Sequence, residues 1–103
     1  MSTHRVARFS DLEEGVGLRI EIADHRIAVF LVDGVLFALG DRCSHAEASL
    51  SEGEVFGTEV ECPRHGSSFE LSTGEPRSLP ATKPVPVYRV WSEGDDLYLA
   101  VDE

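Results

Sequence analysis

The sequence has few cysteines, little positive charge and no long apolar run. Only 2 of its 103 residues are cysteine, and 9 are lysine or arginine against 19 aspartate and glutamate, which gives a formal net charge of −10. A disulfide-rich secreted scaffold is therefore excluded, and nucleic acid is not an expected partner because phosphate binding requires a basic face. No stretch approaches the roughly 18 apolar residues of a membrane span, so no membrane partner is expected.

The chain is expected to be a single cytoplasmic domain. Residues 1–5 lack the apolar core of a signal peptide. At 103 residues, one domain covering 1–103 is the natural expectation, and folding should bury about two-thirds of the unfolded surface. A modest hydrophobic core is therefore available without disulfides.

Each of the two cysteines has a histidine close to it. Cys43 and His45 form a C-x-H pattern, and Cys62 and His65 form C-x-x-H, with sixteen residues between His45 and Cys62. Thiolate and imidazole together suit iron–sulfur centres and zinc, and the neighbouring histidines argue against a disulfide. A zinc finger usually places both cysteines in one half, whereas here each half supplies one of each. This is the ligand set of a Rieske centre, with a structural zinc site as the alternative.

The segment resembles the Rieske-type ferredoxins over about residues 18–101, through Gly66, Thr73-Gly74 and residues 79–84 to the last strand. Within that family it is most similar to the ferredoxin components of bacterial ring-hydroxylating dioxygenases and to the small ferredoxins of iron–sulfur assembly operons. The resemblance implies one [2Fe–2S] cluster per chain. Its inner iron would be bound by Cys43 and Cys62, and its outer iron, near solvent, by His45 and His65.

The resemblance also implies roles for residues around the ligands. Pro63 and Gly66 would shape the second ligand loop, and the segment containing Pro80 would cover the cluster from a third side. Ser67 would donate a hydrogen bond to sulfur, whereas Phe69 stands where respiratory Rieske proteins have a tyrosine donor. Because such donors stabilise the reduced cluster, we expect a potential in the lower half of the Rieske span of about −150 to +300 mV.

The function implied by the resemblance is that of a one-electron carrier, not an enzyme. It would take an electron from a flavin-dependent ferredoxin reductase and pass it to a terminal oxygenase; iron–sulfur assembly or redox sensing is the alternative. Ala48 and Arg64 stand where respiratory relatives have two further cysteines, so no disulfide joins the loops. Arg42 and Arg64 are candidates for orienting the partner. Acidic residues near the loops could steer it: Asp41, Glu47, Glu52, Glu54 and Glu70.

Short strands at close spacing indicate an all-β sandwich or barrel. Strands are expected at 4–9, 18–22, 27–32, 35–39, 54–56, 58–61, 68–71, 85–91 and 97–101, and the almost wholly apolar run 27–32 should be buried on both faces. Asp33-Gly34 is a strong hairpin signal, and Ser10 with Glu13 predicts a capped helical turn. The resemblance narrows this to an antiparallel β-sandwich with a cluster-binding subdomain at about 41–84. His25 has no cysteine partner and is expected at the surface.

Overall fold

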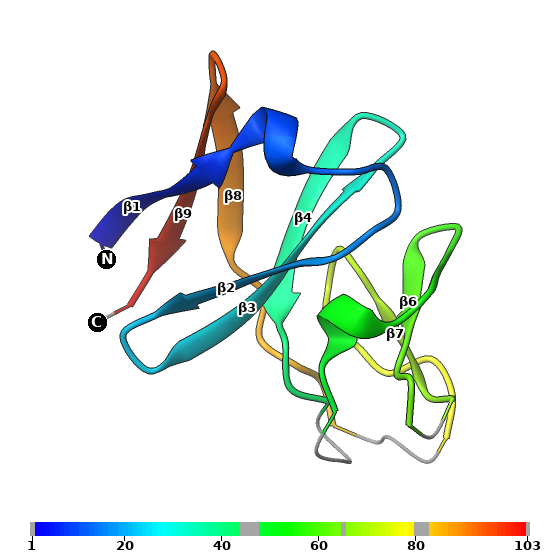
Figure 1. Ribbon diagram of the computed structural model, residues 1–103. Helices are drawn as coiled ribbons and strands as arrows, with labels where there is room; N and C mark the ends of the chain where they lie inside the picture. Colours follow the sequence, from blue (N-terminus) through cyan, green and yellow to red (C-terminus); the bar gives the residue numbers. More distant parts are fainter. Residues whose placement is uncertain (1, 44–47, 65, 80–82, 103) are drawn as a thin grey trace.

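The computed structural model describes residues 2–43, 48–64, 66–79 and 83–102. Within these residues the chain forms nine strands and two short 3₁₀ turns, and the strands pair into three antiparallel sheets of three strands each (Figure 1). The all-β prediction is confirmed. No helix in the described part of the chain is long and apolar enough to cross a bilayer.

Two sheets form the sandwich. The first has the order β1-β9-β8, in which β1 and β9 pair the two ends of the chain: β1 (Ser2–Arg8), β8 (Arg89–Glu93) and β9 (Asp96–Val101). The second has the order β2-β3-β4: β2 (Leu18–Ile22), β3 (His25–Val32) and β4 (Val35–Gly40). Leu97 and Leu99 of β9 share one buried cluster with Ile27 and Val29 of β3, which packs the two sheets together.

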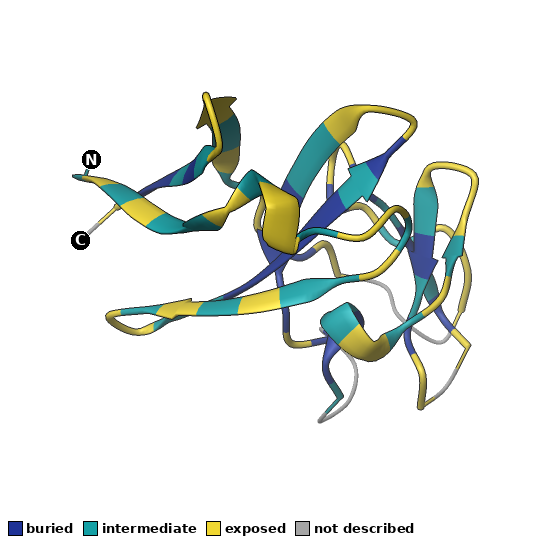
Figure 2. Ribbon diagram, turned by 45° about the horizontal axis from the view of Figure 1, so that its top comes forward, coloured by how far each residue is buried: buried dark blue, intermediate teal, exposed yellow. Residues whose placement is uncertain are grey.

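Strand β3 separates two hydrophobic cores. Its residues 27–30 have no exposed surface, as the apolar run predicts. Because side chains alternate along a strand, Ile27 and Val29 enter the sandwich core, while Ala28 and Phe30 enter a second core that contains Cys43 and Cys62. Figure 2 shows this buried strand at the centre of the molecule.

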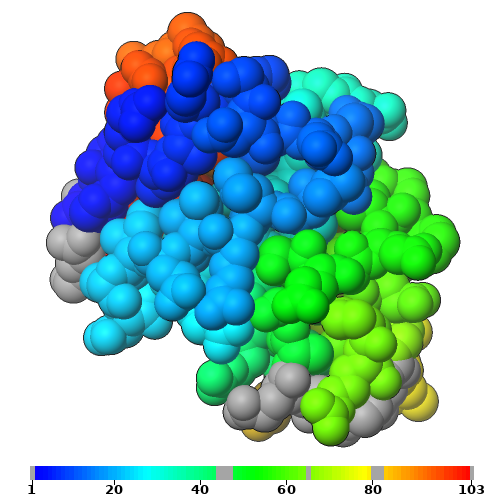
Figure 3. All heavy atoms as spheres, viewed as in Figure 1, coloured from blue at the N-terminus to red at the C-terminus, as the bar shows by residue number. Residues whose placement is uncertain are grey.

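The third sheet covers the second core. It has the order β5-β6-β7 and follows the 3₁₀ turn η2 (Leu50–Glu52): β5 (Val55–Phe56), β6 (Glu59–Glu61) and β7 (Ser68–Glu70). Val60 and Phe69 are fully buried and face each other across β6 and β7. This small sheet is therefore held to β3 and β4 through the same apolar cluster that contains both cysteines. In the space-filling view it forms the lower right end of the molecule (Figure 3).

The hairpin between β3 and β4 is the one predicted. Asp33 and Gly34 have φ values of 51° and 77°. Two successive residues with positive φ are typical of the two-residue turn whose twist matches antiparallel strands. Aspartate tolerates this conformation and glycine adopts it freely, so the dipeptide sets the register of the two strands.

The segment after the prolines differs from the prediction of one strand over 85–91. Strand β8 begins only at Arg89, and the residues before it pair with β4 instead. Gly40 donates its N–H to the Pro86 carbonyl at 2.7 Å, and Tyr88 donates its N–H to the Ala38 carbonyl at 2.9 Å. The segment therefore runs from the second sheet to the first. Pro86 can take part because only its carbonyl is needed.

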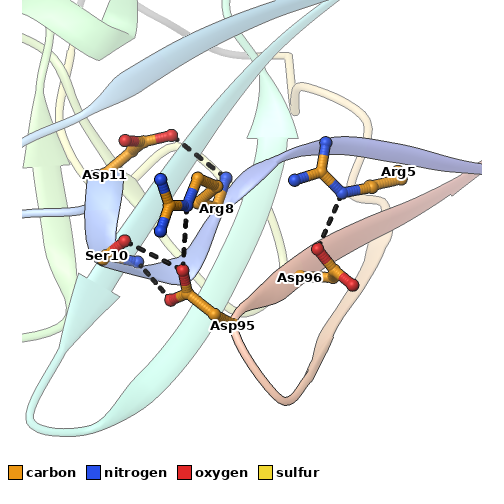
Figure 4. Close-up of polar contacts among 6 residues, drawn as sticks. All are labelled: Arg5, Arg8, Ser10, Asp11, Asp95 and Asp96. Atoms are coloured by element: carbon orange, nitrogen blue, oxygen red, sulfur yellow. Dashed lines mark hydrogen bonds and ion pairs between the residues drawn. The ribbon is translucent and has the colours of Figure 1, made fainter.

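The first turn also differs from the predicted cap. The 3₁₀ turn is η1 (Phe9–Asp11), and the Asp11 carboxylate accepts the Arg8 N–H at 3.0 Å. Ser10 instead donates its N–H and its hydroxyl to the Asp95 carboxylate, each at 3.0 Å (Figure 4). The predicted Ser10–Glu13 cap fails because a side chain from the turn between β8 and β9 reaches Ser10 across the sheet.

Candidate metal centre

The first ligand loop begins where β4 ends. Arg42 and Ser49 form an isolated antiparallel bridge, and inside it Cys43 donates its N–H to the Ala48 carbonyl at 3.0 Å. Cys43 is 2% exposed and belongs to the core beneath the small sheet. The two ends of the loop are thus joined by hydrogen bonds, and the buried cysteine is the first residue after this junction. His45 lies between these ends in sequence and outside the described residues.

The second ligand loop joins β6 to β7 and is closed in the same way. Cys62 donates its N–H to the Ser67 carbonyl at 2.6 Å, and Gly66 donates its N–H to the Cys62 carbonyl at 3.1 Å. Gly66 has φ +73°, which favours glycine and supports its predicted part in shaping the loop. Cys62 and Ser67 have no exposed surface, whereas Pro63 is exposed. His65 lies outside the described residues.

The two loops therefore repeat one arrangement. In each, a buried cysteine opens the loop and its N–H bonds to the carbonyl five residues further on. Both cysteines are buried and belong to one apolar cluster. Among the described residues no three His, Cys, Asp or Glu side chains gather as a metal site, a set from which His45 and His65 are missing.

Asp41 anchors the first loop from below. Its carboxylate has no exposed surface, accepts the Ser51 N–H at 2.8 Å and lies 3.5 Å from Arg26 Nη2. The backbone of Asp41 also forms two hydrogen bonds. Its N–H donates to the Arg26 carbonyl at 2.9 Å, and its carbonyl accepts from the Leu50 N–H at 2.6 Å. The hypothesis that Asp41 steers a partner is therefore wrong, because this carboxylate has no exposed surface and lies against both Arg26 and Arg19, whose Nε is 3.9 Å away.

A third segment is tied to the second loop. Arg77 donates its N–H to the Ser68 carbonyl at 2.7 Å, and Ser68 donates its N–H to the Ser78 hydroxyl at 2.9 Å. The Ser78 hydroxyl also lies 3.5 Å from the Gly66 carbonyl. Leu79, 78% exposed, follows directly. Pro80, the predicted covering residue, lies outside the described residues. The sequence does not predict that the Ser78 hydroxyl ties this segment to the second loop, because an isolated serine between prolines is common in loops.

Arg42 and Arg64 are exposed, as expected of docking candidates. Both line a cavity of about 430 Å³ between the ligand loops, and Arg26 and Ser49 line it too. The Arg26 guanidinium donates to the Ser49 hydroxyl at 3.2 Å, which ties β3 to the end of the first loop. The sequence does not identify Arg26 as part of this site, because nothing in the sequence of β3 shows which distant loop a side chain at its start will contact.

His25 is engaged rather than free at the surface. It is half-buried, with Nε2 2.7 Å from the Asp102 carbonyl oxygen and Nδ1 3.1 Å from the Tyr88 hydroxyl. A carbonyl only accepts, so Nε2 carries a proton. Burial raises the pKa of Tyr88. The partly exposed His25 thus forms its hydrogen bonds away from the ligand loops: it ties β3 to the segment before β8 and to the C-terminal end.

The donor set fits an iron–sulfur cluster. Two buried cysteines open two closed loops, and each loop carries one histidine in sequence. Thiolates can hold the inner iron of a [2Fe–2S] cluster and imidazoles its outer iron, which supplies one-electron chemistry when bound. The protein contributes burial around the cysteines and closed loops that hold their backbone. On these residues alone a tetrahedral zinc site would also be satisfied.

Comparison with known proteins distinguishes an iron–sulfur cluster from a zinc site. Residues 2–89 match the Rieske [2Fe-2S] domain. The chain is 45% identical over 95 residues to the 3-phenylpropionate/cinnamic acid dioxygenase ferredoxin subunit of Escherichia coli K12, covering 91% of this chain and 89% of the relative. A protein of the same description from Shigella boydii is similar to the same extent.

Solved structures agree with this. The ferredoxin of carbazole 1,9a-dioxygenase from Nocardioides aromaticivorans superposes with a TM-score of 0.93 at 32% identity, covering 99% of this chain and all of that one. The ferredoxin seen with its oxygenase in a carbazole 1,9a-dioxygenase complex has a TM-score of 0.88 at 36% identity, with 95% and 92% covered. The cofactor is therefore the [2Fe–2S] cluster and not zinc. The chain belongs to the Rieske [2Fe–2S] family: it is a Rieske-type ferredoxin, an electron-transfer protein rather than a catalytic enzyme.

Proposed function

We propose that this ferredoxin carries single electrons from a flavin-dependent ferredoxin reductase to a terminal oxygenase. The observation that carries the proposal is the pair of buried cysteines in two matching loops at one end of the sandwich, where a cluster is sheltered yet close to a surface. The 45% identical relative is named as a dioxygenase ferredoxin subunit, and the 36% identical structure was solved in complex with an oxygenase.

The proposed roles of the site residues follow the resemblance. Cys43 and Cys62 bind the inner iron, and His45 and His65 bind the outer iron through which electrons enter and leave. Other residues support the cluster or its partner contacts: Ser67 and Gly66 in the second loop, Pro80 over the cluster, Arg42 and Arg64 at the rim. The proposal takes residues 1–103 as one Rieske domain, with a cluster-binding subdomain at about 41–84, working in the cytoplasm.

The first test is spectroscopic. The purified protein is examined by optical and EPR spectroscopy before and after reduction with dithionite. A brown protein whose reduced signal has the low average g value of histidine-ligated clusters is expected. Replacing His45 or His65 by cysteine should raise that average g value, because sulfur then replaces nitrogen on the outer iron. An unchanged signal would contradict the assigned histidines.

The second test addresses the partners. The ferredoxin is combined with NADH and the flavin-dependent reductase and terminal oxygenase encoded by the same organism. Oxygenase turnover should depend on this ferredoxin and saturate as its concentration rises. Reduction by the reductase without any transfer to an oxygenase would favour the alternative role in iron–sulfur assembly or redox sensing.

A further inference from the structure

The cavity between the ligand loops is bounded by residues that flank both cysteines. Its volume is about 430 Å³, and the side chains that matter here are Arg26, Arg42, Arg64, Ser49, Glu52 and Pro63. Arg42 directly precedes Cys43, and Pro63 directly follows Cys62. The cavity therefore lies beside the cluster-binding loops, and a charge bound in it would lie near the cluster.

The charge around this cavity is opposite to that of the chain. The protein has a formal net charge of −10 and only 9 basic residues, yet the described residues that line this cavity include three arginines and one carboxylate, that of Glu52. Asp41 does not line the cavity. It is fully buried and its carboxylate lies 3.5 Å from Arg26 Nη2, so it offsets part of the positive charge of Arg26. In the described part of the lining, guanidinium groups therefore outnumber carboxylates.

Two of these guanidinium groups have donors to spare. Arg26 uses Nη2 for Asp41 and Ser49, while its buried Nε has no hydrogen-bond partner. Arg64 is exposed, and among the described residues it makes no ion pair or side-chain hydrogen bond. A buried donor without a partner is costly, and a guanidinium matches the geometry of a carboxylate or a phosphate. The cavity thus has the chemistry of an oxyanion site.

We propose that this cavity binds a small oxyanion, a carboxylate or a phosphate, and releases it when the cluster is reduced. The first part stands on the cavity alone; the second rests on the proposed function, since it requires the cluster. The reduced cluster carries one more negative charge and repels the bound anion. By linkage, the anion then lowers the reduction potential, and a tenfold weaker affinity in the reduced state corresponds to about 59 mV for one electron.

The test measures the midpoint potential of the holoprotein by protein-film voltammetry as phosphate or acetate is added at constant ionic strength, with chloride as the balancing salt. The potential should fall by about 59 mV per tenfold difference in affinity and then level off. Arg64→Gln should remove most of this fall while leaving the optical spectrum unchanged. Arg77→Gln is the matched control, because it removes one positive charge next to the second loop but does not line the cavity.

The outcomes separate the two proposals. A saturable fall in wild type and in Arg77→Gln, but not in Arg64→Gln, supports the site, and a response to both phosphate and acetate assigns it to oxyanions in general. No response beyond that to chloride, or equal loss in both variants, would overturn it. In either case an intact Rieske spectrum leaves the electron-carrier role standing, whereas the absence of that spectrum would defeat the proposed function itself.

Discussion

Asp41 shows what single residues contribute that sequence does not reveal. It lies in the same kind of setting in sequence as Asp33, after an apolar strand and beside glycine. Asp33 is exposed in a turn, whereas Asp41 is completely buried against Arg26. The difference arises because Arg26, fifteen residues away, turns its side chain toward the first loop. Burial of a charge depends on such distant partners, which no local pattern records.

Asp41→Asn should destabilise the protein and raise the reduction potential. The substitution removes a buried charge and leaves Arg26, which is 33% exposed, without its counter-ion. We expect a loss of about 1–3 kcal/mol in the free energy of unfolding, below the full cost of a buried pair because solvent reaches Arg26. The melting temperature is followed by circular dichroism and the potential by voltammetry. Asp33→Asn, in the exposed turn, should change neither; a similar effect in both would contradict the assigned role.

The potential should also respond to hydroxyl groups near the cluster. Ser67 is fully buried directly after Gly66, and Phe69 is fully buried in the same core as the cysteines. Ser67→Ala should lower the potential and Phe69→Tyr should raise it, because donors to sulfur stabilise the reduced state. Ser68→Ala, whose hydroxyl lies 3.2 Å from that of Ser78, is the control and should have a smaller effect. Equal potentials in all three variants would show that neither hydroxyl position matters.

At the scale of elements, β3 joins the scaffold to the metal centre. The two faces of this strand belong to different cores, and only one core contains the cysteines. The apolar run made burial on both faces predictable, and the strands around it were also close to prediction because alternation and turn residues are local signals. The switch of residues 86–88 from β4 toward β8 was not predictable, since pairing partners far apart in sequence decide it.

The two faces of β3 should respond differently to truncation. Phe30→Ala opens the core beside the cysteines, and Ile27→Ala opens the core of the sandwich. Both should destabilise the protein, by about 3–5 and about 2–5 kcal/mol respectively. Only Phe30→Ala should change the EPR line shape and speed the loss of the cluster on warming. The prediction fails if Ile27→Ala disturbs the cluster signal to the same degree.

A polar contact network joins the turn between β8 and β9 to η1. Asp95 accepts hydrogen bonds from Ser10 and from Arg8 Nε at 3.0 Å, and Arg5 pairs with Asp96 at 2.7 Å (Figure 4). These bonds favour the charged carboxylate, so the pKa of Asp95 lies below its ordinary value of 3.8, with the Arg8 hydrogen bond as the largest cause. The contribution of Asp95 to stability is thus present above pH 3.8 and is lost as pH falls through the depressed pKa.

Asp95→Asn should therefore lower the melting temperature at neutral pH, by an amount that shrinks in acid. The difference between wild type and variant is followed from pH 7 downward by circular dichroism. It should be constant at first and narrow only below the ordinary pKa of 3.8. Glu93→Gln, on the adjacent end of β8, serves as the control. A difference that grows as pH falls would mean that the sign of the pKa shift is wrong.

At the scale of the whole molecule, the metal centre lies at one end of an acidic protein, beside a group of basic side chains. The sequence predicts four ligands, since C-x-H and C-x-x-H is a specific arrangement, but it does not predict the residues that surround them. The described ends of the ligand loops, with η2, lie at one end of the molecule, and η1 with the β8–β9 turn lies at the other (Figure 1). Basic side chains gather in the cavity at the first end, within a strongly acidic protein.

The acidic surface should speed the encounter with a basic redox partner. Glu52 and Glu54 are exposed beside the small sheet, so they remain candidates for steering although Asp41 is not. The rate of reduction by the reductase should fall as ionic strength rises, by about tenfold between low and high salt, because salt screens long-range attraction. Stopped-flow bleaching of the oxidised cluster measures this rate.

The double variant Glu52→Gln with Glu54→Gln should weaken this salt dependence more than Glu13→Gln with Glu93→Gln, which removes the same charge at the opposite end. A rate that is independent of salt would rule out steering, and equal effects of the two pairs would mean that net charge, not the face beside the cluster, guides the partner.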